Sequence, residues 1–123
     1  EAVCEYAKEL KVDKNIRFLG VRDDISALLS AADVFIFPSR FEGLSITCIE
    51  AQFSGLPCVL SKNISSEVKI SKDVYFLSID STDGWAETAL ALCKERKSAR
   101  LCEVAKNYDI INQQYQIKSI LEV

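Results

Sequence analysis

The chain has 123 residues, of which 49% are hydrophobic and 27% charged, and these proportions are ordinary for one globular domain. Its net charge of −3 argues against a basic nucleic-acid-binding surface, and the lack of any run of about 20 apolar residues excludes a membrane-spanning helix. The absence of histidine excludes Ser-His and Cys-His nucleophiles and mixed cysteine–histidine zinc sites. Any acid–base chemistry must therefore come from carboxylates, lysines, tyrosines or the substrate.

The five cysteines are scattered through apolar surroundings, and none form a Cys-x-x-Cys pair. An odd number of such residues is typical of reduced thiols in a cytoplasmic protein. We therefore expect small core residues rather than metal ligands at Cys4, Cys48, Cys58, Cys93 and Cys102.

The first quarter of the chain predicts a helix, a strand and a second helix. Apolar residues recur at a helical period over residues 1–12, whereas polar and apolar residues alternate over 15–19 as in a short strand. Either Asp23 or Asp24 can cap a helix that runs over 25–32.

The rest of the chain continues the alternation of strands and helices. Residues 34–37 are apolar on both faces, which suits a buried parallel strand that ends at Pro38. A helix over 44–54 follows, and Gly55 provides its stop. Further strands are expected at 58–60 and 74–77, and helices at 85–96, at 98–108 and from 110 to the C-terminus.

This alternation indicates βαβ units, and therefore an α/β fold with a parallel sheet flanked by helices. The crossovers should be right-handed. Ligands of such sheets bind outside the carboxyl ends of the strands. The loops expected at these ends are residues 20–24, 38–45 and 61–65.

The segment after residues 34–37 combines a loop glycine with the start of a helix. Gly43 has no side chain, so a ligand can approach the backbone closely there. The helix that follows presents unpaired N–H groups and a positive dipole end, which can hold phosphate without a basic side chain. A diphosphate would repel the carboxylate of Glu42, so we expect Glu42 one step away, accepting hydrogen bonds from neutral hydroxyls.

Glu50 lies farther along the same predicted helix. It shares a mainly apolar face with Ile46 and Phe53, so its carboxylate needs a partner that offsets the cost of desolvation. A ribose diol can donate two hydrogen bonds to the two carboxylate oxygens. Arg17 or Arg22 is an equally good structural partner, and spacing alone does not separate these alternatives.

Six short motifs resemble, in order and spacing, the family 4 (group 1) glycosyltransferases, which are retaining enzymes of the GT-B fold. The shared pattern is two glutamates separated by seven residues, here Glu42 and Glu50. The resemblance is close over residues 15–67 and looser toward the C-terminus. The motifs are Ile16-Arg17-Phe18-Leu19-Gly20, Ala32-Asp33-Val34, Pro38-Ser39, Glu42-Gly43, Glu50-Ala51 and Gly55-x-Pro57.

A narrower resemblance points to bacterial capsular or exopolysaccharide glycosyltransferases. It implies a Rossmann-like, nucleotide-sugar-binding C-terminal domain over residues 1–123, with the first strands and the whole N-terminal acceptor domain outside this chain. We accordingly expect the chain to be part of a longer protein and to be inactive alone. The narrower wording is Glu42-Gly43-Leu44-Ser45, Glu50-Ala51-Gln52, Leu56-Pro57-Cys58, Glu67-Val68-Lys69-Ile70 and Trp85-Ala86.

The resemblance also implies roles for individual residues. Glu42 would contact hydroxyls of the donor sugar and act in catalysis, and Glu50 would bind the ribose. Many relatives have glycine in place of Ser45. The other donor-binding residues implied are Val21 and Arg22 beside the base, Gly43, Leu44 and Ser45 with backbone amides facing the sugar, and Ile46 and Thr47 at the diphosphate.

The reaction that the resemblance implies transfers a sugar from a nucleotide-diphospho-sugar, with UDP favoured, to a growing polysaccharide or lipid-linked acceptor. It needs no cofactor and no metal, and the chain has no Asp-x-Asp motif. The leaving diphosphate helps to deprotonate the acceptor on the same face, and stabilising its developing charge is the main task. The protein would be cytoplasmic, with peripheral association of the full-length protein at the inner face of the bacterial membrane.

Two other functions fit the same fold. One is a non-catalytic scaffold that binds sugar nucleotides, and the other is a UDP-sugar epimerase of GT-B shape. The lack of histidine weighs against the epimerase. A nicotinamide dehydrogenase is disfavoured because no Gly-x-Gly-x-x-Gly opens a helix.

Overall fold

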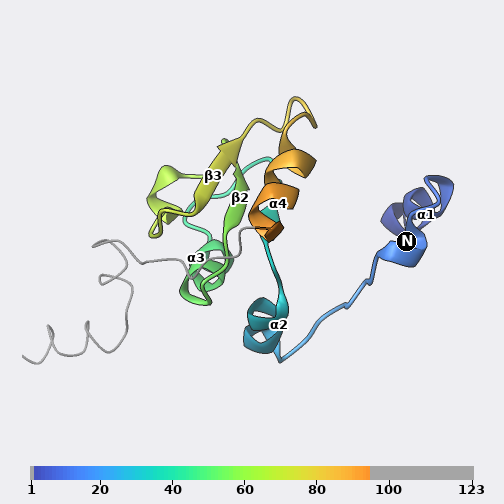
Figure 1. Cartoon of the computed structure of the whole chain (residues 1–123), viewed down its shortest axis with the longest axis horizontal. Coiled ribbons are helices and arrows are strands. Elements are labelled where there is room, and N and C mark those ends of the chain that lie inside the picture. Colours follow the sequence, from blue (N-terminus) through green and yellow to red (C-terminus); the bar gives the residue numbers. More distant parts are fainter. Residues whose placement is uncertain (1, 95–123) are drawn as a thin grey trace, which may run out of the picture.

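The computed structural model of the chain describes residues 2–94. In this part a small parallel sheet carries one helix on each face, and two further helices precede it (Figure 1). The helices predicted at 98–108 and from 110 onward lie outside the described residues, as do Cys102 and the end of the helix predicted at 85–96.

The three strands of the sheet are parallel and lie in the order β1-β2-β3, with Cys58 of the central strand opposite Phe35 and Val74. This arrangement confirms the predicted α/β class, and each strand begins within one residue of its predicted start. The strands are β1 (Phe35–Phe37), β2 (Cys58–Ser61) and β3 (Val74–Leu77).

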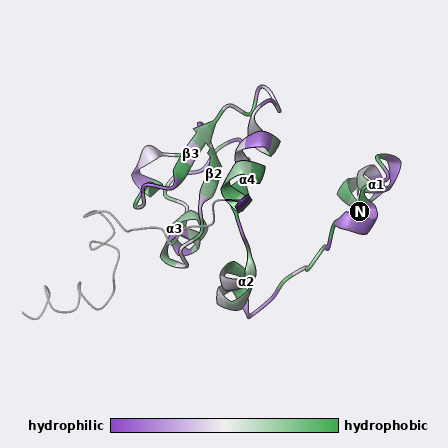
Figure 2. Cartoon of the chain, viewed as in Figure 1, coloured by the Kyte–Doolittle hydropathy of each residue, from purple (hydrophilic) through white to green (hydrophobic). Residues whose placement is uncertain are grey.

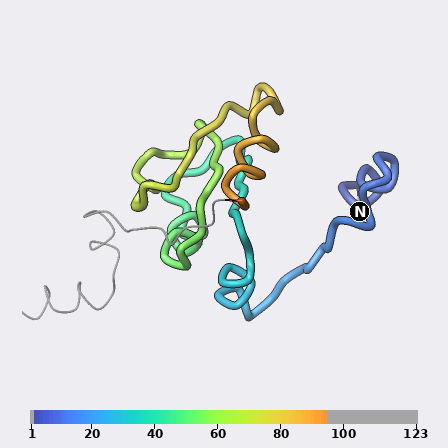
Figure 3. Tube along the Cα trace, in the orientation of Figure 1, coloured from blue at the N-terminus to red at the C-terminus, as the bar shows by residue number. Residues whose placement is uncertain are grey.

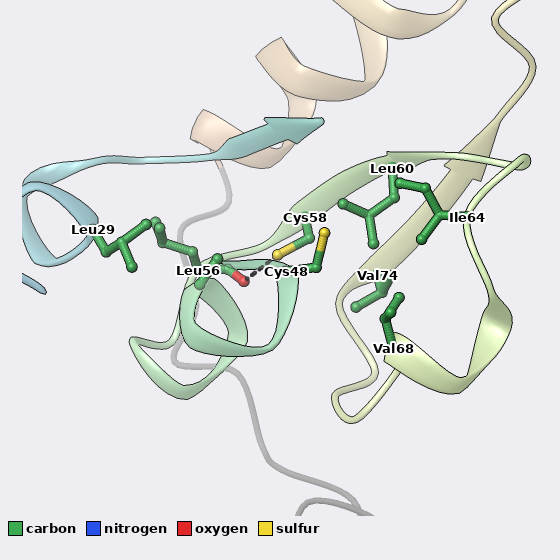
Figure 4. Close-up of a cluster of buried hydrophobic side chains, with 9 residues drawn as sticks. Leu29, Cys48, Leu56, Cys58, Leu60, Ile64, Val68 and Val74 are labelled. Carbon is green, nitrogen blue, oxygen red and sulfur yellow. Dashed lines mark hydrogen bonds between the residues drawn. The ribbon is translucent and has the colours of Figure 1, made fainter. Parts of the chain in front are cut away.

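Helices α3 (Ile46–Phe53) and α4 (Trp85–Lys94) lie on opposite faces of the sheet (Figures 1 and 4). The end of α3 confirms Gly55 as the helix stop, since Gly55 has a φ of 75°. Its N–H donates to the Gln52 carbonyl at 2.9 Å, and the Leu56 N–H donates to the Ala51 carbonyl at 3.1 Å. These two bonds close a Schellman motif, which directs the chain from α3 back into β2.

The core lies between the sheet and α3. Cys58 and Leu60 of β2 are completely buried and pack with Cys48 and Ala51 of α3 (Figure 4). Apolar residues concentrate in the strands (Figure 2). Because β2 is buried along its whole length, it anchors the loops that leave the carboxyl edge of the sheet.

Residues 15–19 do not form the predicted strand. They belong to an extended connection between α1 (Ala2–Glu9) and α2 (Ile25–Ala31), which runs clear of the sheet (Figure 3), and Phe18 in it is 54% exposed. A strand exists through its hydrogen-bonded neighbour, and none of the described strands pairs with this segment. In a doubly wound sheet, strands on either side of the switch point follow one another in the chain without being neighbours.

Strand β1 is also less buried than its sequence predicts. Ile36 is 46% exposed, although both of its neighbours in the strand are partly buried. Side chains alternate between the two faces of a strand, so Ile36 lies on the face opposite to the core that Phe35 and Phe37 contact, and it lines a cavity beside the start of α4. The prediction of a strand buried on both faces is therefore wrong for the described part of the chain.

The cysteines of the described part are free thiols, as expected, and Cys48 and Cys58 are buried in the core. Residues 2–94 contain no group of three or more side chains that could hold a metal ion. None of their helices has the length and apolar character needed to cross a membrane.

Burial, together with the nearby Cys48 thiol, raises the pKa of Cys58 from 9.0 to about 12. The unfolded chain therefore loses the Cys58 proton first, and the folded state loses stability as pH rises through about 9. We expect this group alone to lower the free energy of unfolding by about 1.4 kcal/mol per pH unit between its unfolded and folded pKa values. Urea unfolding at pH 7 to 10.5 measures this slope. The Cys58→Ala variant serves as the control, and an equal alkaline slope in both proteins would contradict the assignment.

Candidate functional site at the start of helix α3

Two loops meet at the carboxyl edge of the sheet. Residues 38–45 lead from β1 to α3, and residues 62–65 follow β2. Glu42 of the first loop and Ile64 of the second pair in an isolated parallel bridge. This bridge extends the pairing of β1 with β2 beyond the regular strands and fixes the backbone of Glu42 beside the end of β2. Two of the three loops predicted to face a ligand are thus adjacent.

The Glu42 carboxylate is half-buried, and none of the described residues forms an ion pair with it. Its charge acts on the first turn of α3. Burial raises the pKa of the Cys48 thiol, a hydrogen bond with Ser45 lowers it, and the charge of Glu42 raises it further. The carboxylate therefore lies near the start of α3 and has oxygens available to accept hydrogen bonds from a ligand.

The start of α3 has no side-chain cap. Ser45 occupies the N-cap position and is only 6% exposed, yet its hydroxyl makes no capping hydrogen bond. The first N–H groups of a helix have no partner inside it, and the helix dipole adds partial positive charge there. Leu44, Ile46 and Thr47 are exposed around this end. The arrangement can hold an anionic group through the backbone.

Gly43 lies between the carboxylate and the helix. Its φ is outside the left-handed range, and a Cβ built on it meets no atom within 4 Å. Neither the backbone conformation nor the packing of the described chain therefore requires glycine here. The position instead leaves space beside the exposed start of α3.

The two loop glycines on either side of α3 provide a matched test. We expect Gly43→Ala to leave the free energy of unfolding within about 0.5 kcal/mol of the wild type and to weaken the binding of an anionic ligand at the start of α3. Gly55→Ala should lower stability by about 1 kcal/mol or more, because Gly55 has a positive φ. Urea unfolding and calorimetric titration measure the two effects. A Gly43→Ala protein with unchanged affinity would show that the loop does not approach the ligand.

Glu50 is exposed on α3 and lines a cavity of about 300 Å³ between α2 and α3. Three of the side chains that line the cavity are apolar, Ile25, Leu29 and Phe53. An apolar cavity with one carboxylate suits a ligand that has a flat apolar part and neighbouring hydroxyls. The remaining lining residues are Ser26 and Ser54.

Val21 and Arg22 lie on the exposed segment that leads into α2. The Arg22 guanidinium pairs with Asp24, with Nε donating to Oδ1 and Nη2 to Oδ2, both at 2.6 Å, and it holds the pKa of the Asp24 carboxyl below its ordinary value. Asp24 stands at the N-cap of α2, as expected, but its carboxylate binds Arg22 and does not cap the helix. The structure therefore does not pair Arg22 with Glu50. The role of Val21 and Arg22 at the base stays a prediction.

Gln52 belongs to this region of the structure, although the sequence did not indicate a role for it. Its side chain is completely buried, and its amide forms four hydrogen bonds with backbone groups. The available signal was its spacing of four residues from Cys48, which places a polar side chain on the buried face of α3. A buried amide requires partners, and here three of the four lie on a distant segment of the chain.

A second cavity, of about 400 Å³, lies between β1 and the start of α4. The indole N–H of Trp85 donates to the Ser78 carbonyl at 2.8 Å and ties α4 to the end of β3. This cavity has one charged side chain, Arg40, and no carboxylate, so it does not compete with Glu42 and Glu50 as a site of acid–base chemistry. Its lining residues are Ile36, Pro38, Arg40, Ile79, Ser81, Thr82 and Trp85.

Comparison with known proteins places the chain in a family. The model of the family described as glycosyl transferases group 1 matches residues 1–95. A UDP-Gal:alpha-D-GlcNAc-diphosphoundecaprenol alpha-1,3-galactosyltransferase of Escherichia coli is 28% identical over 94% of this chain and 32% of its own length. The glycosyltransferase EpsF of Bacillus subtilis is 38% identical over 68% of this chain and 22% of its own length.

A third relative is a D-inositol 3-phosphate glycosyltransferase of Corynebacterium efficiens, which is 31% identical over 98% of this chain and 30% of its own length. No solved structure matches the chain. The chain thus spans about a third or less of the length of these relatives. Since the family model covers more than half of the chain and includes every described element, the chain belongs to the group 1 glycosyl transferases.

Proposed function

We propose that this chain is the donor-binding part of a retaining glycosyltransferase and that it binds a nucleotide-diphospho-sugar, with UDP as the nucleotide. The observation that carries the proposal is the uncapped start of α3, which stands between the available carboxylates of Glu42 and Glu50. Along α3 the order is carboxylate, anion site and carboxylate. A nucleotide-diphospho-sugar matches this order, because its diphosphate lies between two groups rich in hydroxyls, the sugar and the ribose.

The parts of the donor follow the length of α3. The diphosphate lies at the backbone N–H groups of Ile46 and Thr47. From Ser45 to Glu50 the helix rises about 7.5 Å, a length that a diphosphate can bridge between a sugar and a ribose. The ribose hydroxyls donate to Glu50, and the base packs against the apolar walls of the adjacent cavity. The sugar extends in the other direction, past Gly43, so that its hydroxyls donate to Glu42.

The proposed transfer uses charge stabilisation rather than a covalent intermediate. As the bond between sugar and diphosphate breaks, negative charge grows on the leaving phosphate, and the N–H groups of α3 stabilise it where it develops. Glu42 holds the sugar hydroxyls during this step. The diphosphate accepts the proton of the acceptor hydroxyl on the same face, which retains the configuration at the anomeric carbon. We propose that the step needs no metal.

The names of relatives favour a polysaccharide or lipid-linked acceptor. The Escherichia coli relative is named for UDP-Gal as donor and a diphosphoundecaprenol-linked sugar as acceptor. Because the chain spans only part of this protein, we assign the acceptor site to parts of the full-length protein beyond the matched region. An acceptor of this type would hold the full-length protein peripherally at the inner face of the membrane. A capsular or exopolysaccharide pathway is the corresponding biological setting.

Calorimetric titration of the full-length protein with UDP, GDP and ADP tests the donor assignment. We expect UDP to bind most tightly and uridine to bind far more weakly, because uridine lacks the diphosphate that meets α3. The Gly43→Ala variant should weaken UDP-sugar binding, and Glu87→Ala, at an exposed position of α4, serves as a control outside the site. Equal binding of uridine and UDP, or binding of none of the three nucleotides, would contradict the proposal.

A further inference from the structure

We propose that Gln52 is a positioning residue that sets the place of Glu42 through the connection between β2 and β3. The inference rests on the proposed function for the importance of Glu42. It goes beyond that function because Gln52 touches neither the donor nor the reacting atoms. Hydrogen bonds join Gln52 to the same connection whose Ile64 pairs with the backbone of Glu42.

The Gln52 side chain uses its whole hydrogen-bonding capacity. Its Nε2 donates to the carbonyls of Cys48 and Val68, both at 2.8 Å. Its Oε1 accepts from the N–H groups of Ile70 and Ser71, both at 3.0 Å. A primary amide offers two donors and an oxygen with two lone pairs, so all four positions are filled. One side chain therefore joins α3 to three successive points of a segment sixteen to nineteen residues away.

That segment is the connection from β2 to β3, residues 62–73, which includes a 3-10 helix at Ser66–Val68. Its apolar side chains Val68 and Ile70 are completely buried. The Gln52 amide acts here in place of a neighbouring strand, because it gives the backbone at residues 68–71 the partners that a sheet would supply. The far part of the connection is thereby fixed to α3.

The near part of the same connection supports the candidate site. The Ile64 N–H donates to the Ser61 carbonyl at 3.1 Å, and Ile64 pairs with Glu42 in the parallel bridge. Ile64 is 4% exposed and belongs to the core. The loop that carries Glu42 is therefore supported by the connection from β2 to β3. The near part of this connection turns at the end of β2, and hydrogen bonds from Gln52 hold its far part.

The exchange of backbone amides in the full 123-residue chain tests this connection without any ligand. Gln52→Met has a similar volume and loses all four hydrogen bonds. By NMR we expect the amides of Asn63 and Ile64, which donate to Ser61, to exchange at least about tenfold faster than in the wild type, relative to those of Val59 and Leu60 in β2. Ser71→Ala is the matched control. Its hydroxyl is buried in the same cluster without a partner among the described residues, and its removal should leave these rates unchanged.

A second variant covers the case in which Gln52→Met does not fold. In Gln52→Glu, a neutral carboxyl at low pH keeps both acceptor positions and one donor, whereas the carboxylate at high pH has no donor. Exchange of the Asn63 and Ile64 amides, relative to wild type at the same pH, should therefore rise as the pH is increased. Faster exchange only at residues 68–71, or an equal acceleration in β2, would overturn the inference, because the effect would then be purely local or global.

Kinetics of the full-length protein provide the functional part of the test. Gln52→Met should lower kcat by about tenfold or more with KM for the donor nearly unchanged, since misplacement of Glu42 affects the transition state more than binding of the nucleotide. A rise in KM alone would contradict a positioning role. If the wild type shows no sugar transfer at all, the proposed function fails, and the exchange measurements still decide whether Gln52 positions Glu42.

Discussion

Glu42→Ala is expected to abolish sugar transfer by the full-length protein while leaving its fold intact. The carboxylate is proposed to hold the donor sugar as the anomeric bond breaks, and the loss of one such contact typically costs about 10²–10³-fold in kcat. The fold should persist because none of the described residues forms an ion pair with this carboxylate, and the bridge to Ile64 involves only the backbone. Turnover of a UDP-sugar, together with urea unfolding, measures both effects.

The control for this substitution is Glu67→Ala. Glu67 is a second glutamate on a loop of the same edge, exposed at the 3-10 helix of the β2–β3 connection. Its removal should change neither turnover nor stability. A Glu42→Ala enzyme with wild-type kcat would remove Glu42 from the mechanism, and a wild-type protein that binds UDP without turnover would favour a non-catalytic sugar-nucleotide-binding scaffold.

The parts of the fold that were predictable from sequence are those whose causes are local. The apolar run that forms β2 and the glycine that ends α3 lie within a few residues of the structure that they determine. The strand predicted at 15–19 depended on a distant neighbour, which a pattern of alternating residues does not reveal. Ile36 shows the same dependence, because its burial is set by what lies beside and above β1 rather than by its own sequence.

The candidate site was likewise only partly predictable from the sequence. Glu42, Gly43 and the start of α3 are contiguous, so the sequence placed them together, and the structure adds that this helix end has no side-chain cap. The choice of partner for Glu50 needed three dimensions, since Arg22 could have reached Glu50 or Asp24 by spacing alone. The partners of Gln52 were beyond sequence reasoning because they are carbonyl and N–H groups, which every residue possesses.

Glu50→Ala is expected to weaken UDP binding by on the order of 10²-fold without loss of stability. Two ribose hydroxyls donating to a carboxylate form charge-assisted hydrogen bonds, each worth about 1.5–3 kcal/mol. Alanine is the most favourable residue in a helix, and the exposed Glu50 side chain forms no ion pair with other described residues. The substitution should therefore not lower the stability of α3. Glu87→Ala, at an exposed position of α4, is the matched helical control.

A thermodynamic cycle tests whether the Glu50 carboxylate binds the ribose hydroxyls. It compares the wild type and Glu50→Ala, each with UDP and with 2′,3′-dideoxy-UDP. If Glu50 binds the ribose, the wild type should lose nearly the same affinity for the dideoxy nucleotide as Glu50→Ala loses for UDP, and the variant should no longer distinguish the two nucleotides. Independent, additive losses would mean that Glu50 acts elsewhere, for instance through the charge of the cavity between α2 and α3. The comparison is informative because Glu50 is the one charged side chain among the described residues that line this cavity, and alanine leaves only the hydroxyls of Ser26 and Ser54 as polar side-chain groups there. Calorimetry at one salt concentration measures all four affinities, and their coupling separates ribose recognition from general electrostatics.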